Sequence, residues 1–146
     1  MILLLLALQG VPGELRLEKQ KTQVDVKVGG ETVAVYVFDD PLVRRPYFAQ
    51  VRAPGGPQLT RTHPPLEGKD ATDHATMHPG RWLGFGDLGG ADFWRNKGRV
   101  GAEKVEVEGS TISGGFAYKD GERLVCRETA RLSFRRRPEG LSIQFD

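Results

Sequence analysis

Apolar and polar residues alternate along most of the chain with a period of two, which is typical of β-strands that cover one side of a core. Residues 22–28 and 31–37 both follow this pattern, and Gly29-Gly30 separates them. Glycine accepts the positive φ that a tight hairpin turn requires, so the pattern predicts a β-hairpin. Its apolar faces are expected to be Val24, Val26 and Val28 on one strand, and Val33, Val35 and Val37 on the other.

The last third of the chain repeats the alternation in runs over residues 104–108, 111–119, 122–135 and 141–146, with turn residues between them. In the third run one parity carries Leu124, Cys126, Ala130, Leu132 and Phe134, and the other carries Arg123, Arg127, Arg131 and Arg135. We interpret the arginine stripe as a solvated sheet face, with a groove for an anionic ligand as the alternative. Cys126 is expected to be a buried, inert thiol.

The middle of the chain has no period of its own. A short strand is expected over residues 45–51 and a turn over 53–57, and no stretch shows the apolar spacing of a long helix. The whole pattern predicts an all-β, mostly antiparallel β-sandwich that occupies residues 14–146 as a single domain with a long Gly/Pro-rich functional loop. The final run ends with an apolar stripe and no closing element, so we expect the domain to be incomplete at its C-terminus.

Composition narrows the functional classes. The chain has 146 residues, of which 38% are hydrophobic and 27% charged, and this suits one globular domain. A net charge of +2 gives no reason to expect a nucleic-acid partner. The single cysteine excludes an intramolecular disulfide and a zinc site of several thiolates. No motif in the sequence identifies a cofactor, so the cofactor is unknown at this point.

The first 13 residues contain an apolar run, Met1 to Leu8, that is too short to span a bilayer. The run fits the hydrophobic part of a signal peptide, although no basic residue precedes it, and a buried first strand is the alternative. A signal peptide implies a secreted or periplasmic protein, and a buried strand implies a cytoplasmic one. No segment is expected to span a membrane.

All three histidines and both tryptophans lie between residues 61 and 97, which indicates a functional loop on a rigid scaffold. Histidine transfers protons or binds metals near neutral pH, and an adjacent carboxylate orients its ring. Asp73, His74 and His78 are therefore the candidate chemical centre. Pro79 disfavours a helical metal site, but a loop site with His63 or an aspartate as third ligand stays open, as do plain hydrogen bonds to the backbone.

Trp82 and Trp94 offer flat apolar faces that can stack on sugar rings. Polar residues that can bond sugar hydroxyls surround them in sequence, and these candidates are His63, Asp87, Asp92, Arg95 and Asn96. Either tryptophan can equally be a core residue, and Asp87 and Asp92 can equally cap turns.

Several short motifs together resemble a bacterial family catalogued as methane oxygenase PmoA-like. They are Arg45-Pro-Tyr-Phe48, Pro54-Gly-Gly56, Thr60-Arg61, Asp73-His74, His78-Pro-Gly-Arg-Trp82, Gly86-Asp87 and Asp92-Phe-Trp94. The family is common in bacteria that degrade polysaccharides, and its members resemble the β-sandwiches of the galactose-mutarotase supersandwich. Its usual pattern is Asp-His-Pro-His-His-Arg-Gly-Leu-Trp, whereas Ala75-Thr76-Met77 stands in the middle here, so one histidine is missing. Family members run to about twice this length, so the resemblance implies a partial supersandwich.

The resemblance implies a small-molecule or carbohydrate ligand. One hypothesis is an acid/base enzyme in which His74 and His78 transfer protons, Asp73 orients them and Arg61 anchors substrate oxygens. A second is a carbohydrate-binding protein that stacks sugars on Trp82 and Trp94. A third is a metal-dependent oxidoreductase, as the family name suggests.

Overall fold

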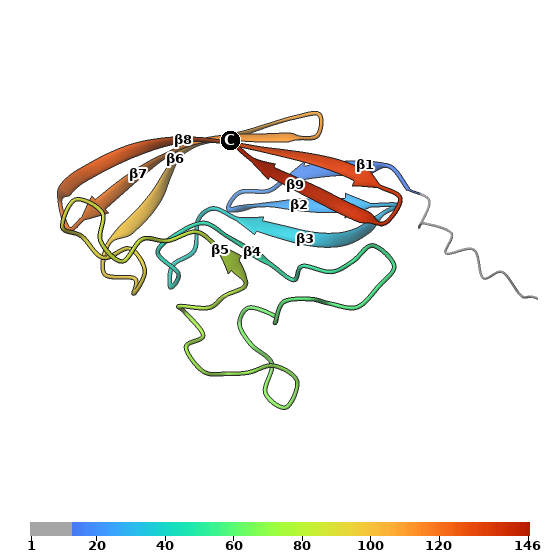
Figure 1. Ribbon diagram of the computed structural model, residues 1–146, viewed down its shortest axis with the longest axis horizontal. Coiled ribbons are helices and arrows are strands. Elements are labelled where there is room, and N and C mark those ends of the chain that lie inside the picture. The colour runs from blue at the N-terminus through green and yellow to red at the C-terminus, as the bar shows by residue number, and fades with distance from the viewer. Residues whose placement is uncertain (1–12) are drawn as a thin grey trace, which may run out of the picture.

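A computed structural model describes residues 13–146, which form two antiparallel sheets packed face to face (Figure 1). The first sheet contains, in spatial order, β1 (Leu15–Lys19), β2 (Gln23–Val28), β3 (Glu31–Val37), β4 (Tyr47–Ala49) and β5 (Arg81–Trp82). The second contains β6 (Arg99–Glu108), β7 (Thr111–Asp120), β8 (Arg123–Arg137) and β9 (Gly140–Phe145). The prediction of an all-β antiparallel sandwich is confirmed, and the proposed signal segment lies outside the described residues apart from its last position.

The core between the sheets follows the period of two. Val24, Val26 and Val28 of β2 are completely buried, because every second side chain of a strand points to the same face. They form one cluster with residues of the second sheet, among them Ile112, Phe116, Leu132 and Phe134. The arginines of the predicted stripe are exposed, so the solvated-face interpretation is confirmed; they are Arg123, Arg127, Arg131 and Arg135.

The apolar face expected for β3 is wrong at Val33, and that expected for β8 is wrong at Leu124, which is 41% exposed. The register pairs Val26 with Ala34 but Lys27 with Thr32, so Val33 is an extra residue on β3. Such a bulge shifts the alternation by one position. Val33 therefore packs in the core between the sheets, while Val35 and Val37 pack on the outer face of the first sheet.

That outer face is also covered. The irregular segment 39–98 runs beneath the first sheet, where it is drawn in green and yellow-green in Figure 1. Val43 of this segment packs there with Val35 of β3 and Tyr47 of β4. Asp40 caps the turn before Val43 by accepting hydrogen bonds from the backbone N–H groups of Leu42 and Val43. Because β3 is buried on both faces, it is the rigid strand against which the segment folds.

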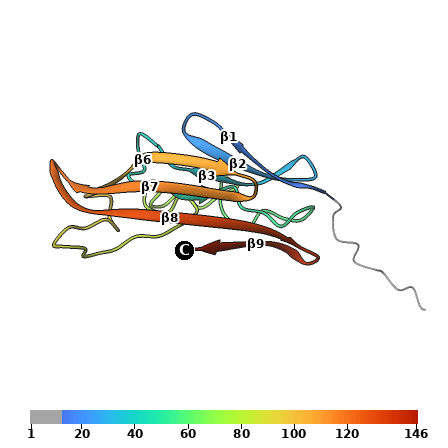
Figure 2. The ribbon, with the colours of Figure 1, turned by 90° about the horizontal axis from the view of Figure 1, so that it is seen from above.

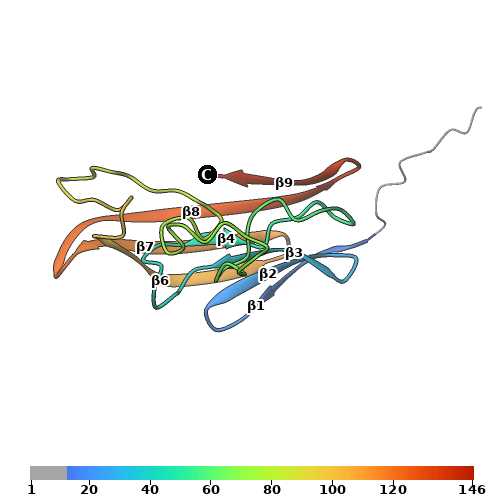
Figure 3. The same ribbon diagram turned by 90° about the horizontal axis from the view of Figure 1, so that it is seen from below.

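The two lateral edges of the sandwich differ. At one edge, Nζ of Lys19 on β1 donates a hydrogen bond to the carbonyl of Val105 on β6 at 2.6 Å and ties the sheets together. At the other edge the first sheet ends in β5, which has only two residues, and the second sheet ends in β9. Figure 2 shows β9 as the outermost strand from above, and Figure 3 shows it from below together with the irregular segment. None of the described residues belongs to a helix long and apolar enough to cross a membrane.

The buried ring of Phe134 gives a direct test of this core. Phe134 is 1% exposed, whereas Leu59 is 68% exposed. We expect Phe134→Ala to lower the free energy of unfolding by about 3–5 kcal/mol, because it leaves a cavity. Leu59→Ala is expected to change it by about 0.5 kcal/mol or less. Urea unfolding followed by circular dichroism measures both, and similar losses in the two variants would contradict the packing described.

Candidate functional site

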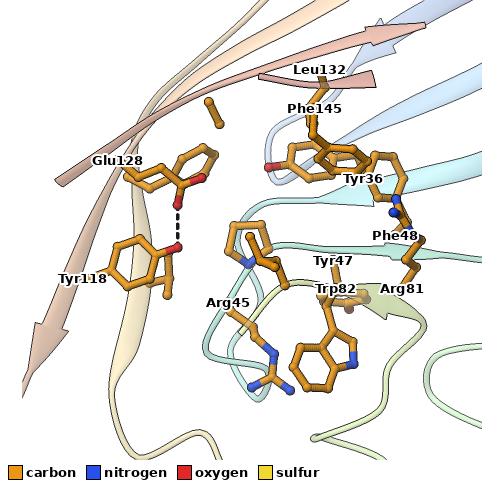
Figure 4. A pocket seen from close by; sticks show the side chains of 15 residues that line it. Tyr36, Arg45, Tyr47, Phe48, Arg81, Trp82, Tyr118, Glu128, Leu132 and Phe145 are labelled. Atoms are coloured by element: carbon orange, nitrogen blue, oxygen red, sulfur yellow. Dashed lines mark hydrogen bonds between the residues drawn. The ribbon is translucent and has the colours of Figure 1, made fainter. Parts of the chain in front are cut away.

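A cavity of about 310 Å³ opens at the β5/β9 edge of the sandwich (Figure 4). Its walls come from both sheets and from the irregular segment, and most of the lining is aromatic or aliphatic. The aromatic lining residues include Tyr36, Tyr47, Phe48, Trp82, Tyr118 and Phe145. A volume of this size and a largely apolar lining with few polar groups are typical of small-molecule sites.

A carboxylate and a phenol form the polar group on one wall of this cavity. The hydroxyl of Tyr118 donates a hydrogen bond to Glu128, and Figure 4 shows the two side chains facing one another from β7 and β8. Burial raises the pKa of Tyr118, and the hydrogen bond to Glu128 adds to this rise. Burial also raises the pKa of Tyr36, with a contribution from the same carboxylate. Both phenols therefore stay protonated and can donate hydrogen bonds.

Arg45 connects the cavity to the irregular segment. Its side chain is 3% exposed, and its guanidinium carbon lies 3.8 Å from the centroid of the Trp82 ring. Burial lowers the pKa of Arg45 to about 10, so it remains charged at neutral pH. Its Nη atoms donate hydrogen bonds of 2.6–3.0 Å to the carbonyl oxygens of Met77, Phe93 and Trp94 and to Oδ1 of Asn96. One buried cation thus holds two distant parts of the segment.

The segment brings four of the predicted residues into one chain of ring contacts. The ring centroids of His74 and His78 lie 5.8 Å apart, those of His78 and Trp82 lie 5.9 Å apart, and those of Trp82 and Trp94 lie 4.7 Å apart. Trp82 also lines the cavity, whereas neither histidine does. Trp94 is 43% exposed and presents an accessible ring at the end of this chain of contacts, beside Trp82.

Asp73 and Arg61 lie next to this chain of rings. Oδ2 of Asp73 is 3.1 Å from Nδ1 of His74, and this hydrogen bond is the main cause that lowers the pKa of Asp73. The donors of Arg61 contact the loop backbone, with carbonyl oxygens of Ala71, Asp73, His74 and His78 as acceptors. The observed contacts of Arg61 thus hold the loop, and its role as an anchor for substrate stays a prediction.

The other predicted polar residues are dispersed. Oδ1 of Asp87 accepts a hydrogen bond from the backbone of Gly90, and Asp92 accepts from the backbone of Trp94 and from Arg95, so both aspartates cap turns. Asn96 joins the Arg45 network and also donates to the carbonyl of Thr76. Within residues 13–146 no three side chains of histidine, cysteine, aspartate or glutamate are grouped as metal ligands would be.

His63 lies apart from the other two histidines. Its side chain is 8% exposed, its Nε2 is 3.8 Å from Oδ2 of Asp40, and its ring packs edge-on against Tyr47. The hydroxyl of Tyr47 donates to the same Asp40 oxygen at 2.8 Å. Burial lowers the pKa of His63, and this outweighs the opposite effect of the Asp40 charge.

Sequence reasoning missed Arg45 and Glu128, although each left a signal. Glu128 lies on the same parity of β8 as Ala130 and Leu132, so an acidic residue interrupts an inward-facing stripe. In the same way, Arg45 has the same parity as the buried residues Val43 and Tyr47. A charged residue at an inward position is rare without a partner and therefore marks a site.

The buried position of His63 predicts how stability depends on pH. Because the pKa of His63 is lowered on folding, the unfolded chain binds a proton at higher pH than the folded protein does. The stabilising contribution is complete above the unfolded pKa of about 6.5 and is lost as pH falls below it. We expect the free energy of unfolding to fall less between about pH 7.5 and pH 5.5 in His63→Gln than in the parent protein. The exposed His74→Gln is the matched control, and the same change in both variants would contradict the assignment.

The Arg45 network predicts a second outcome. Lysine keeps the positive charge of Arg45, but its single ammonium group lacks the planar set of donors with which the guanidinium contacts several acceptors at once. We expect Arg45→Lys to leave the far-UV circular dichroism of the sheets intact and to shift tryptophan emission to longer wavelength, because Trp82 and Trp94 lose their support. Arg99→Lys, at an exposed arginine that pairs with Asp39, is the control. Unchanged emission in Arg45→Lys would contradict the proposed network.

The comparisons with known proteins add one finding. A protein-family profile described as "Family of unknown function (DUF6807)" matches residues 23–146, which include both sheets almost completely and the whole irregular segment. No curated protein and no solved structure matches the chain. The protein belongs to this family of unknown function, DUF6807.

Proposed function

We propose that this protein binds a carbohydrate in the cavity between its two sheets. The observation that carries the proposal is the aromatic lining combined with the hydrogen-bonded pair of Tyr118 and Glu128. A sugar ring has apolar C–H faces and polar hydroxyl edges, so it needs flat apolar walls together with a few fixed donors and acceptors. The resemblance to the PmoA-like family supports the same class of ligand.

The individual contacts follow from the geometry of the walls. The carboxylate of Glu128 accepts hydrogen bonds from sugar hydroxyls, and Tyr36 and Tyr118 are protonated phenols beside it. Trp82 lines the cavity as one of its walls. Arg45 covers one face of the Trp82 ring and fixes its position. Trp94 does not line the cavity, but it packs against Trp82 and is 43% exposed, so in this proposal it offers a further ring for stacking.

A second candidate function is an acid/base enzyme that acts on a sugar. The observation in its favour is that the pair of Asp73 and His74 connects through His78 to Trp82, a wall of the cavity. In this function His78 transfers a proton to a substrate that extends past Trp82, and Asp73 orients His74. Binding is the better-supported function because the residues that line the cavity do not include these histidines.

Trp82 lines the proposed site and Trp94 packs against Trp82, so intrinsic fluorescence reports binding directly. We expect titration with a panel of monosaccharides to change tryptophan emission saturably. Glu128→Gln is expected to weaken binding about tenfold or more, the effect of losing a hydrogen bond to a charged acceptor. Glu106→Gln, at an exposed glutamate of β6 that pairs with Lys104, is the matched control.

The histidine variants separate the two candidates. The binding function predicts that His74→Ala and His78→Ala retain affinity and that Trp94→Ala loses it. The enzyme function predicts conversion of the bound sugar, detected by NMR, that His78→Ala abolishes. Failure of every sugar in the panel to bind would overturn both.

A further inference from the structure

The charged groups that line the cavity are separated by sign. Glu128 is the one carboxylate among the lining residues, and it is engaged by Tyr118. The cations are Arg45 and Arg81, which lie away from Glu128 in Figure 4, on the side of Trp82 and Phe145. Any ligand that fills the cavity therefore meets a negative group on one wall and positive groups on another.

Arg81 is placed to meet a ligand at the opening. It belongs to the edge strand β5, its side chain is exposed, and its guanidinium carbon lies 4.6 Å from the centroid of the Phe145 ring. Stacking on an aromatic ring fixes the plane of a guanidinium while leaving its N–H donors free at the edge. Within residues 13–146 Arg81 forms no ion pair.

Arg45 adds a second positive charge that no carboxylate neutralises by contact. All four hydrogen bonds of its Nη atoms go to neutral oxygens, and its buried Nε has no hydrogen-bond partner among the described residues. Asp92 acts on it only at longer range. A buried cation that is solvated by neutral dipoles alone raises the local potential and favours an anionic group nearby.

We propose that the ligand is an acidic sugar of the uronate class, whose carboxylate binds Arg81 at the opening while its hydroxyls reach Glu128. This inference rests on the carbohydrate-binding function proposed above. A carboxylate matches the planar donor fork of arginine in size and geometry. The repulsion from Glu128 makes the reverse orientation unfavourable, so the ligand has one preferred direction.

The test compares sugars that differ only at C6. Glucose and glucuronate form one pair, galactose and galacturonate another, and tryptophan fluorescence of the full chain measures each Kd. We expect at least one acid to bind about tenfold or more tighter than its neutral partner, and added salt to reduce the ratio. Arg81→Gln should abolish the preference and Arg81→Lys should retain part of it. Arg131→Gln, at an exposed arginine on the outer face of β8, should leave it unchanged.

The outcomes distinguish this inference from the function on which it rests. If neutral and acidic sugars bind equally, or if Arg81→Gln keeps the preference, the acidic-ligand inference fails and carbohydrate binding stands. If no sugar of either kind binds, the proposed function itself fails. Tighter binding of glucose 6-phosphate than of glucuronate overturns the carboxylate assignment. Glu128→Gln provides the internal check, because it should weaken both members of a pair without lowering the preference for the acid.

Discussion

The buried guanidinium of Arg45 is the interaction on which the candidate site depends. An unpaired charge in an apolar environment is costly, so it persists only where hydrogen bonds and stacking replace its hydration. Here three backbone carbonyls, one side-chain amide and the face of Trp82 do so. The carbonyls come from parts of the chain that share no regular structure. Without Arg45 these carbonyls would need water as a partner, and Trp82 would lose the surface that fixes its ring.

The sandwich makes this arrangement possible by burying β3 on both faces. One face of β3 packs against the second sheet, and the other packs against Val43 of the irregular segment, beside Tyr47 of the neighbouring strand β4. A segment of 60 residues with little secondary structure, such as 39–98, is uncommon in a compact domain unless it has a function. Arg61 and Arg45 stabilise this segment by donating to its carbonyl groups, because the segment itself supplies few ladder hydrogen bonds. The cost of ordering such a segment is consistent with a site that has to be preorganised.

The sheets were predictable from sequence because their signal is local. The valines of β2 alternate at a period of two, and the turn at Gly29-Gly30 has the positive φ that the glycines indicated. The bulge at Val33 was not predictable, because nothing in the alternation distinguishes a bulged residue from its neighbours. The cavity was missed for a different reason: Tyr36, Glu128 and Phe145 are far apart in sequence and meet only when both sheets are assembled. The histidines and tryptophans were found because they lie close together in the chain, yet that proximity did not reveal which of them reaches the cavity.

The distinction between the loop and the cavity bears on mechanism. Acid/base catalysis requires the proton-transferring group within hydrogen-bond distance of the reacting atom, or one water away. His78 contacts Trp82, and Trp82 lines the cavity, so an indole ring stands next to the histidine where a substrate atom would be needed. The cavity is lined by groups of opposite charge that do not form an ion pair with one another. Glu128 accepts a hydrogen bond from Tyr118, and Arg45 donates its hydrogen bonds to neutral oxygens. Fixed charges of opposite sign can orient a polar ligand, whereas neither histidine lines the cavity, and for that reason we propose recognition rather than catalysis.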